Sequence, residues 1–426
     1  MDEMMISPLS QPSADSSPAR GEPDITTGDD LPPEGGGKNE DTTLGAPLEG
    51  ELAFAQQMTE GGIPESRPHH LKLLLPLLPP VLLTALFYAL QDNKALMTAW
   101  VRNILAPFIQ TVGRFWAFFP FSVAELLAAL FLVGSVVWLV RAVVLLLKKW
   151  EGKAFVRRML AYLTLLCWLW CAFCWMWNCT YRAVGFAEEY GLSKAPYTPE
   201  QLVDVTILFA IQAAELADDV PRNGDLSFAV SPKEAFERAD GVYAAVGEHF
   251  PSLNIPHRRA KPIICSRLQS ALGYTGVYFP FTGEANVNVD QTACLVPFTI
   301  AHEMAHQRMV ASEDECNFIG VLACITSEDV VFQYSGWMMG LVYLVNAVYD
   351  ISPELANEIM RQGFSDELRK DWNDNYEYWQ ALKSPTQEKA QEAMDEVYDG
   401  YLKSQGQTLG LMSYDACVDL LVNYFS

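Results

Sequence analysis

The sequence predicts a mainly α-helical protein in which transmembrane helices are followed by an α+β domain with a small sheet or hairpin. Apolar segments cluster between residues 67 and 180, and their length of about 20 residues is what a helix needs to cross a bilayer. Residues 181–426 mostly follow helical periodicity, whereas 276–289 is rich in β-branched and aromatic residues, as strands are. Hydrophobic residues make up 50% of the chain, which is high for a soluble protein but low for a transporter with many spans.

Residues 1–66 are predicted to form a disordered acidic tail. They contain 14 acidic and 2 basic residues, together with many Pro, Gly and Ser residues. Such a segment has too little apolar surface to offset the entropy lost on folding. The first apolar stretch lies far from the N-terminus, so no cleavable signal peptide is expected.

Residues 67–180 are predicted to form a membrane domain with three transmembrane helices, at about 73–90, 123–147 and 159–177. Prolines bend the first of these, for which a buried helix of a soluble core is the alternative. Between the first two spans, 97–119 mixes aromatic residues with two arginines. This mixture favours a helix that lies in the membrane interface.

Basic residues predict the orientation of these helices. The short loop 148–158 contains five Lys and Arg residues, which places it in the cytoplasm. Arg67 and Lys72 place the N-terminus on the same side. With three crossings, residues 181–426 would lie outside the cytoplasm, so we expect a multi-pass protein of the cell membrane with the lipid bilayer as a partner.

Residues 181–426 are predicted to form one extracytoplasmic, mostly helical domain. Its 35 acidic and 16 basic residues would repel phosphate backbones, so no nucleic acid partner is expected. Thr198 is the predicted N-cap of a helix that runs towards Ala217, and Ser231 that of a helix that runs to about Gly247. After Pro297 nearly everything is helical, with breaks near Ser312, Ser327, Ser352, Ser365, Ser384 and Gly406.

The sequence HEMAH, residues 302–306, is the strongest chemical signal in the chain. His302 and His306 are four residues apart, so on one face of a helix predicted at 299–311 their imidazoles can converge on a metal ion. Glu303 would lie beside the open coordination position, where a carboxylate can take a proton from a water molecule activated by Zn²⁺. A chance pair on a structural helix is the alternative.

A third metal ligand is required, and two acidic residues follow closely. Ser312 is a predicted N-cap, and Glu315 would complete a capping box with it. This leaves Glu313 as the predicted ligand and Glu315 as the alternative, although a more distant ligand remains open. Ordinary acidity in the first turn of a helix would also explain Glu313. Asn317, one turn later, is predicted to hydrogen-bond a ligand.

These residues resemble the glutamate zincins, in which an HExxH helix is followed by a helix with ExxxD or ExxxN. Glu313 and Asn317 match the second element. The chain resembles in particular a bacterial domain-of-unknown-function family, number 3810, of three-span membrane proteins with such a domain. The resemblance covers about residues 71–426 and rests on FPFTGEANVN (279–288), TIAHEMAHQR (299–308), EDECNF (313–318), YSG (334–336) and the closing GQ…SY (406–414). The family usually has Gly at Met309 and Ala at Cys316.

The resemblance implies a zincin-like, minimal gluzincin fold that hydrolyses peptide bonds of an unknown protein or peptide. An edge strand beside the metal helix would pair with an extended peptide, and Gly283, Glu284, Ala285, Asn286, Val287 and Asn288 are the candidate; a plain core hairpin is the alternative. Tyr334 is the first candidate for stabilising the transition state, ahead of Tyr278, Tyr414 and His257, although packing roles are commoner for such residues. A non-catalytic membrane sensor or assembly protein that zinc stabilises is the alternative function, and a transporter is a weaker one.

Overall fold

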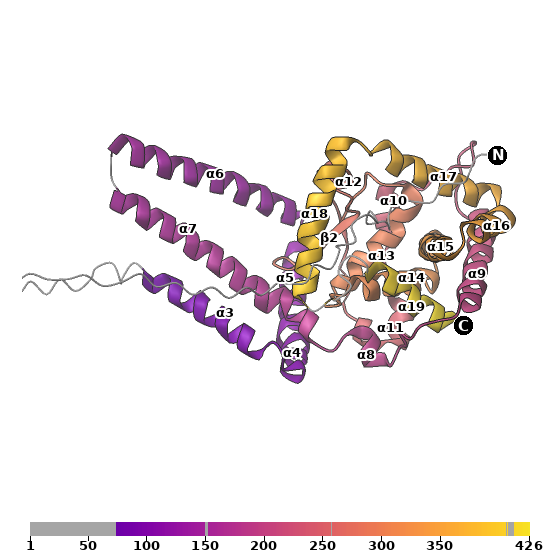
Figure 1. Cartoon of the computed structure of the whole chain (residues 1–426), viewed down its shortest axis with the longest axis horizontal. Coiled ribbons are helices and arrows are strands. Elements are labelled where there is room, and N and C mark those ends of the chain that lie inside the picture. The colour runs from indigo at the N-terminus through magenta and orange to yellow at the C-terminus, as the bar shows by residue number, and fades with distance from the viewer. Residues whose placement is uncertain (1–73, 150–151, 257, 406, 408–412) are drawn as a thin grey trace, which may run out of the picture. The chain divides into compact units, whose positions relative to one another are not determined.

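The computed structural model describes residues 74–149, 152–256, 258–405, 407 and 413–426 (Figure 1). The predicted acidic tail, 1–66, lies outside the described residues, as do Leu73 and His257. The described chain is mainly helical and contains one three-stranded sheet. The predicted fold class, mainly α with a small sheet, is therefore confirmed.

The N-terminal helices follow the three predicted apolar segments. They are η2 (Leu75–Leu77), α3 (Leu78–Leu90), α4 (Lys94–Trp100), η3 (Val101–Leu105), α5 (Ala106–Trp116), α6 (Val123–Lys149), α7 (Gly152–Phe173) and η4 (Cys174–Asn178). Two stretches are long and apolar enough to cross a membrane, namely Val123–Lys148 and Gly152–Asn178. The apolar helix Leu75–Leu90 is shorter than such a span. Two candidate spans therefore stand on length and composition, while the predicted third crossing stays a prediction.

Helices α4 and α5 coincide with the predicted interfacial segment. They are joined through η3, a π-helical turn, without a break in the chain. Asn93 begins this stretch, because its side chain accepts a hydrogen bond from the Leu96 amide. Phe108 and Phe115 of α5 are more than half exposed. The helix is thus present, and its place in a membrane interface stays a prediction.

Helix α6 is joined to the sheet by buried polar contacts. Glu284 of β3 (Glu284–Val287) accepts hydrogen bonds from the Val123 and Ala124 amides at the start of α6, at 3.3 and 2.8 Å. Its carboxylate also forms a buried ion pair with Lys261. A carboxylate is favourable at a helix N-terminus, where amide groups lack partners. The start of the first candidate span, Val123–Lys148, is therefore fixed to the central strand of the sheet.

The rest of the chain forms helices that pack on one another. They are η5 (Thr180–Arg182), α8 (Phe186–Tyr190), α9 (Pro199–Ala217), α10 (Pro232–Arg238), α11 (Ala244–His249), η6 (Pro251–Leu253), α12 (Ser266–Ala271), η7 (Ala293–Leu295), α13 (Val296–His306), α14 (Glu313–Ile325), α15 (Val330–Ile351), α16 (Pro353–Gly363), α17 (Asp366–Ala381), α18 (Pro385–Ser404) and α19 (Ser413–Phe425).

Most of the predicted helix starts and breaks are confirmed. Thr198 and Gln201 form a full capping box at the start of α9, and the side chains of Ser352, Ser365 and Ser384 cap α16, α17 and α18. The break near Gly406 lies outside the described residues. The single helix predicted from Ser231 to about Gly247 is wrong, because it ends at Arg238 and a second helix begins at Ala244. Gly241 between them has φ +90°, which no helix allows.

The sheet contains the predicted hairpin and one further strand. Strand β2 (Gly276–Phe279) pairs antiparallel with β3, with Gly276 opposite Val287. Strand β1 (Lys261–Pro262) pairs parallel with the other side of β3. The order is therefore β1-β3-β2, and β3 is the central strand.

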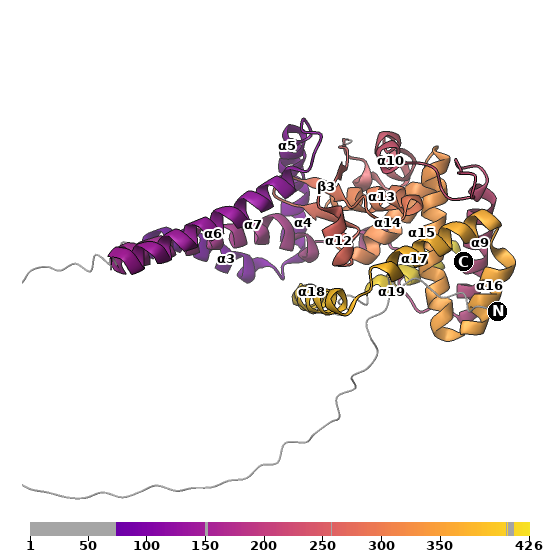
Figure 2. The same ribbon diagram turned by 90° about the horizontal axis from the view of Figure 1, so that it is seen from above.

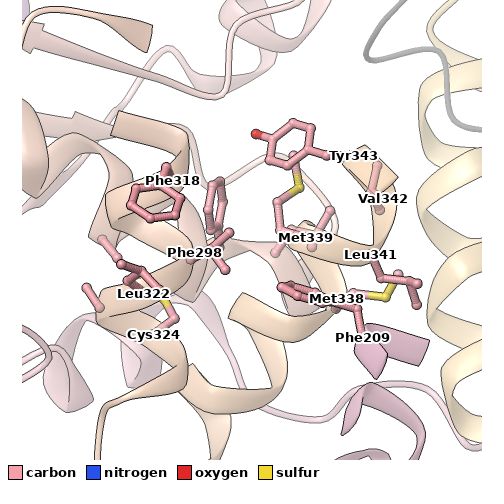
Figure 3. Close-up of a cluster of buried hydrophobic side chains, with 14 of the residues drawn as sticks. Phe209, Phe298, Phe318, Leu322, Cys324, Met338, Met339, Leu341, Val342 and Tyr343 are labelled. Atoms are coloured by element: carbon pink, nitrogen blue, oxygen red, sulfur yellow. The ribbon is translucent and has the colours of Figure 1, made fainter. Parts of the chain in front are cut away.

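The core of the domain surrounds α13 and α14 (Figures 1 and 2). Figure 3 shows the buried side chains at which α9, α13, α14 and α15 meet. They include Phe209, Phe298, Phe318, Leu322, Met338 and Leu341. Because close-packed interiors hold side chains in fixed rotamers, the HEMAH segment of α13 is carried by a rigid element.

Candidate metal centre

Helix α13 carries His302, Glu303 and His306 and ends at the last of them. The helix predicted to continue to residue 311 is therefore shorter than expected. Met309 has φ +65°, a left-handed conformation that favours glycine over other residues. This is the position at which the resembled family usually has Gly. The chain turns here and returns as α14, which packs against α13.

Three side chains of α13 and α14 meet at one point. The Nε2 atoms of His302 and His306 lie 3.2 and 3.6 Å from Oε2 of Glu313. One ligand atom from each of the three residues lies within 4.8 Å of the others. Ligands of tetrahedral zinc at about 2.0–2.2 Å from the metal lie roughly 3.3 Å apart. The spacing of the three residues therefore fits a zinc ion.

A hydrogen bond to the Val310 carbonyl oxygen determines which ring nitrogen of His306 carries the proton. The other nitrogen, Nε2, faces Glu313. Nδ1 of His306 lies 2.8 Å from the carbonyl oxygen of Val310. A carbonyl oxygen can only accept, so Nδ1 carries the proton, and Nε2 of the neutral ring has a lone pair. That lone pair and the carboxylate of Glu313 face each other in a buried site. They repel each other unless a cation, either a second proton or a metal ion, lies between them.

The pKa shifts of Glu313 and His306 also indicate that a positive charge is required between the two side chains. Burial raises the pKa of Glu313, but the two histidines outweigh burial and hold its pKa well below the usual range. Burial lowers the pKa of His306, whereas Cys316 and Glu313 together raise it well above its usual value. Without a metal, the site would hold a charged His–Glu pair. A divalent cation would take over the role of the additional proton.

Glu303 lies beside this cluster but is not part of it. It is buried, and its Oε2 atom has no hydrogen-bond partner within the described chain. Burial raises its pKa to about 7, despite the opposing effect of the two histidines. A carboxyl group with a pKa near neutrality can both accept and return a proton. The close approach of β2 fixes its place, since a Cβ atom on Gly276 would lie 2.2 Å from Oε1 of Glu303.

Glu315, the alternative third ligand, does not reach the cluster. Its carboxylate accepts hydrogen bonds from the Phe186 and Ala187 amides at 2.9 and 3.0 Å and therefore caps α8. The predicted capping box with Ser312 is also wrong, because Ser312 makes no side-chain cap and bonds to Asp314 instead. A carboxylate with two buried amide partners has no reason to move to a metal. The structure thus brings Glu313 to the histidines and keeps Glu315 away.

Asn317 and Tyr334 do not make the contacts that their predicted roles require. The amide nitrogen of Asn317 and Nδ1 of His302 are both buried without a partner among the described residues, so Asn317 donates no hydrogen bond to a ligand. Tyr334 is fully buried in α15, and its hydroxyl group donates to Asp371 at 2.5 Å. Arg222 lies over its ring. Tyr334 therefore belongs to a buried hydrogen-bond network with Asp371 and not to the His/His/Glu cluster. This corrects its predicted role in stabilising the transition state.

The predicted substrate-binding strand, 283–288, is also corrected. Its ordered part, β3, pairs with β1 on one side and with β2 on the other. Asn286 and Val287 are therefore paired on both sides, and all of β3 is buried, so the strand is not the exposed edge that was predicted. Strand β2 is the outer strand beside α13, and it contains Gly276 next to Glu303.

Several residues near the cluster carried no clear sequence signal. The ring of Trp177, in η4, lies 5.7 Å from that of His306 at 71°. Tyr278 of β2, in contrast, is one of the candidates that the sequence offers for stabilising the transition state; it lies next to His306, and its buried hydroxyl group has no partner among the described residues. Tyr398 of α18 donates a hydrogen bond to Oε1 of Glu313 at 2.7 Å. The other candidates, Tyr414 and His257, are untested, since the side chain of Tyr414 lies outside the described part.

Comparisons with known proteins give a family without an activity. A family model described as "Protein of unknown function (DUF3810)" matches residues 100–422. No curated protein and no solved structure matches the chain. The match begins at the end of α4 and extends into α19, so it includes both candidate spans and the His/His/Glu cluster. The chain therefore belongs to the DUF3810 family of proteins of unknown function.

Proposed function

We propose that this protein is a membrane-anchored, zinc-dependent metallopeptidase with a zincin-like domain, which hydrolyses peptide bonds of a protein or peptide outside the cytoplasm. His302, His306 and Glu313 would hold the zinc ion, and Glu303 would act on water. The observation that carries the proposal is the spacing of the three ligand atoms, at 3.2 and 3.6 Å from histidine to carboxylate, together with a buried carboxylate beside them.

Glu303 has the properties of a general base. A zinc ion bound at the cluster would supply a Lewis acid for the scissile carbonyl group and would lower the pKa of a water molecule. Glu303 would take a proton from the attacking water molecule as its oxygen adds to the carbonyl carbon, and would give that proton to the amine nitrogen as the C–N bond breaks. Its pKa of about 7 suits both transfers near neutral pH. Glu303 is four-per-cent exposed, so bulk water does not compete for its proton.

The outer edge of β2 is the proposed place for an extended substrate. An edge strand leaves one row of amide and carbonyl groups unpaired, and a peptide can pair with it. Strand β2 passes directly beside Glu303 at Gly276. A peptide on this edge would therefore bring its backbone close to the general base.

Membrane anchoring completes the proposal. The stretches Val123–Lys148 and Gly152–Asn178 have the length and hydropathy of spans, and the helix Leu75–Leu90 would be a shorter third crossing. The basic residues between α6 and α7 favour a cytoplasmic loop there. The N-terminus would then be cytoplasmic and residues 181–426 would lie outside.

The variant Glu303→Gln tests this function. The detergent-solubilised full-length protein, loaded with zinc, is incubated with a mixture of unstructured peptides, and products are identified by mass spectrometry. We expect cleavage by the wild type and a rate at least about 10²-fold lower for the variant. General-base catalysis typically increases the reaction rate by about 10²- to 10⁴-fold. Both proteins should contain the same amount of zinc. Equal cleavage by both would exclude Glu303 as the base.

A zinc-stabilised sensor or assembly protein is the second candidate. The observation that favours it is the closure of the site, since the His302 and Glu313 side chains are only 12% and 11% exposed. A sensor would bind zinc, cleave no peptide, and keep its cellular role in the Glu303→Gln variant. The same pair of proteins therefore separates the two functions.

A further inference from the structure

Helix α18 lies next to the His/His/Glu cluster, and few of its side chains are buried. Among its described side chains only that of Leu402 is buried, while Met394 and Val397 are exposed. In Figure 2 the helix forms a layer of its own, apart from α13 and α14. Most helices in proteins are held by an apolar face. Specific contacts of a few side chains must therefore hold α18 in place.

One of these contacts reaches a metal ligand. The hydroxyl group of Tyr398 donates a hydrogen bond to Oε1 of Glu313 at 2.7 Å. The other carboxylate oxygen, Oε2, faces Nε2 of His302 and of His306. The two oxygens of Glu313 thus have different partners. Tyr398 fixes the rotation of the carboxylate, so that a single oxygen points to the metal position.

A second contact joins α18 to the segment that follows α7. The hydroxyl group of Tyr401 donates to the side-chain oxygen of Asn178 at 2.9 Å, and its ring packs against those of Phe173 and Tyr181. The rings of Tyr398 and Tyr401 stack on each other, with an angle of 20° between them. The two tyrosines together hold α18 across the site, and only Tyr398 touches a ligand.

We propose that Tyr398 is a positioning residue of the metal centre, which holds Glu313 as a one-oxygen ligand when α18 is docked. The inference rests on the proposed function, because it requires the His/His/Glu cluster to bind zinc. Removing a hydrogen bond to a metal ligand usually weakens metal binding by 10–100-fold. The presence of α18 on the domain thereby controls how tightly the metal is held.

Two single-oxygen deletions on the same helix test this inference. The full-length protein in detergent is compared with Tyr398→Phe and Tyr401→Phe, each of which removes one hydroxyl group. The zinc dissociation constant is measured by competition with a chelator, and the coordination is followed in the visible absorption of the Co²⁺-substituted protein. We expect zinc affinity to fall about 10–100-fold in Tyr398→Phe. Its Co²⁺ spectrum should also change, because the freed oxygen of Glu313 can approach the metal.

The matched variant separates positioning from simple docking of the helix. Tyr401→Phe should keep the wild-type Co²⁺ spectrum, because Tyr401 does not touch Glu313. Wild-type affinity and spectrum in Tyr398→Phe would overturn the inference, and so would equal losses in the two variants with unchanged spectra. A wild-type protein without zinc would instead remove the metal centre and with it the proposed function. Tyr398 is only half-buried, so its variant is expected to fold.

Discussion

Glu303 lies in an environment that differs from that of an ordinary, exposed carboxylate. Its side chain lies between α13 and β2, with one oxygen that has no partner among the described residues. The charged form is therefore poorly solvated, and its pKa rises from 4.5 to about 7. Catalytic carboxyl groups often have such values, because a base must be deprotonated in part at the working pH and still able to release its proton.

This shift predicts how the metal-free protein responds to pH. A folded carboxyl group with a raised pKa binds more protons than the unfolded chain between pH 4.5 and 7, so stability falls as pH rises through this window. Glu303→Gln has no such group. It should therefore be more stable than the wild type by about 3 kcal/mol at pH 8 and by under about 1 kcal/mol at pH 5. Thermal unfolding of both metal-free proteins at the two pH values measures this difference.

Comparing Glu303→Gln with the wild type cancels the effects of the other titratable groups of the site. His302, His306 and Glu313 are present in both proteins, so their titration affects both curves. A stability difference that is the same at pH 5 and pH 8 would show that Glu303 is not held in a poorly solvated place.

At the level of secondary structure, the close approach of β2 to α13 fixes the position of the Glu303 carboxylate. Gly276 is required there because a Cβ atom would overlap the carboxylate of Glu303 at 2.2 Å. Gly276→Ala should displace Glu303 and lower turnover by about 10²-fold, the usual effect of a misplacement of about 1 Å. Zinc content should not change, because the three atoms nearest to the added Cβ atom all belong to Glu303 and not to a proposed ligand. Peptide cleavage and metal analysis of the variant check both parts.

Gly224→Ala is the matched control for this substitution. A Cβ atom at Gly224 would meet nothing within 4 Å, so the same chemical change should leave turnover at the wild-type level. Loss of zinc together with turnover in Gly276→Ala would contradict the account, since it would mean that β2 supports the ligands and not the base.

The elements also show which parts of the fold the sequence could predict. Helix starts at which a Ser or Thr side chain caps the first turn, such as Thr198 and Ser231, are predicted because the signal is local. The hairpin of β2 and β3 was predicted for the same reason. Strand β1 has only two residues and pairs parallel with a distant segment, so no local pattern marks it. Its pairing also turned the predicted edge strand into a central one.

In the candidate site, too, the sequence predicts local relations between residues but not long-range contacts. Helical spacing predicts that His302 and His306 share one face with Glu303 beside them. Glu313 begins the next helix, and the sequence favours it over Glu315 only through a capping box that the structure does not form. Tyr398 follows Glu313 by 85 residues, and its contact depends on how α18 folds back. Glu315 was considered as a ligand because its partners, the amides of α8, lie far away in the sequence. Long-range contacts decide which of two neighbouring acids is free, and the sequence alone does not contain them.

In the whole molecule, the His/His/Glu cluster lies next to the C-terminal end of the second candidate span, Gly152–Asn178. Trp177, in the apolar stretch Gly152–Asn178, packs against His306. If this stretch crosses the bilayer, a substrate meets the metal close to the membrane surface. Under the proposed function, the peptidase would then act on substrates that reach the membrane surface.

Cysteine labelling tests the proposed orientation. Cys265 is the exposed cysteine of the described chain, and Gly152, at the cytoplasmic end of α7 in the proposal, is exposed and has open space around it. In sealed right-side-out vesicles, a membrane-impermeant maleimide should label Cys265 in the wild type. It should not label Gly152→Cys in a Cys265→Ser background until detergent is added. Labelling of Gly152→Cys alone would reverse the orientation.

His302, His306 and Glu313 are proposed to hold one metal ion. Zinc content of the purified full-length protein tests it directly, in the wild type, in His306→Ala and in His249→Ala, which removes an exposed histidine of α11. The account predicts one zinc ion per chain in the wild type and in His249→Ala, and none in His306→Ala. Equal zinc content in all three proteins, or none in the wild type, would contradict it.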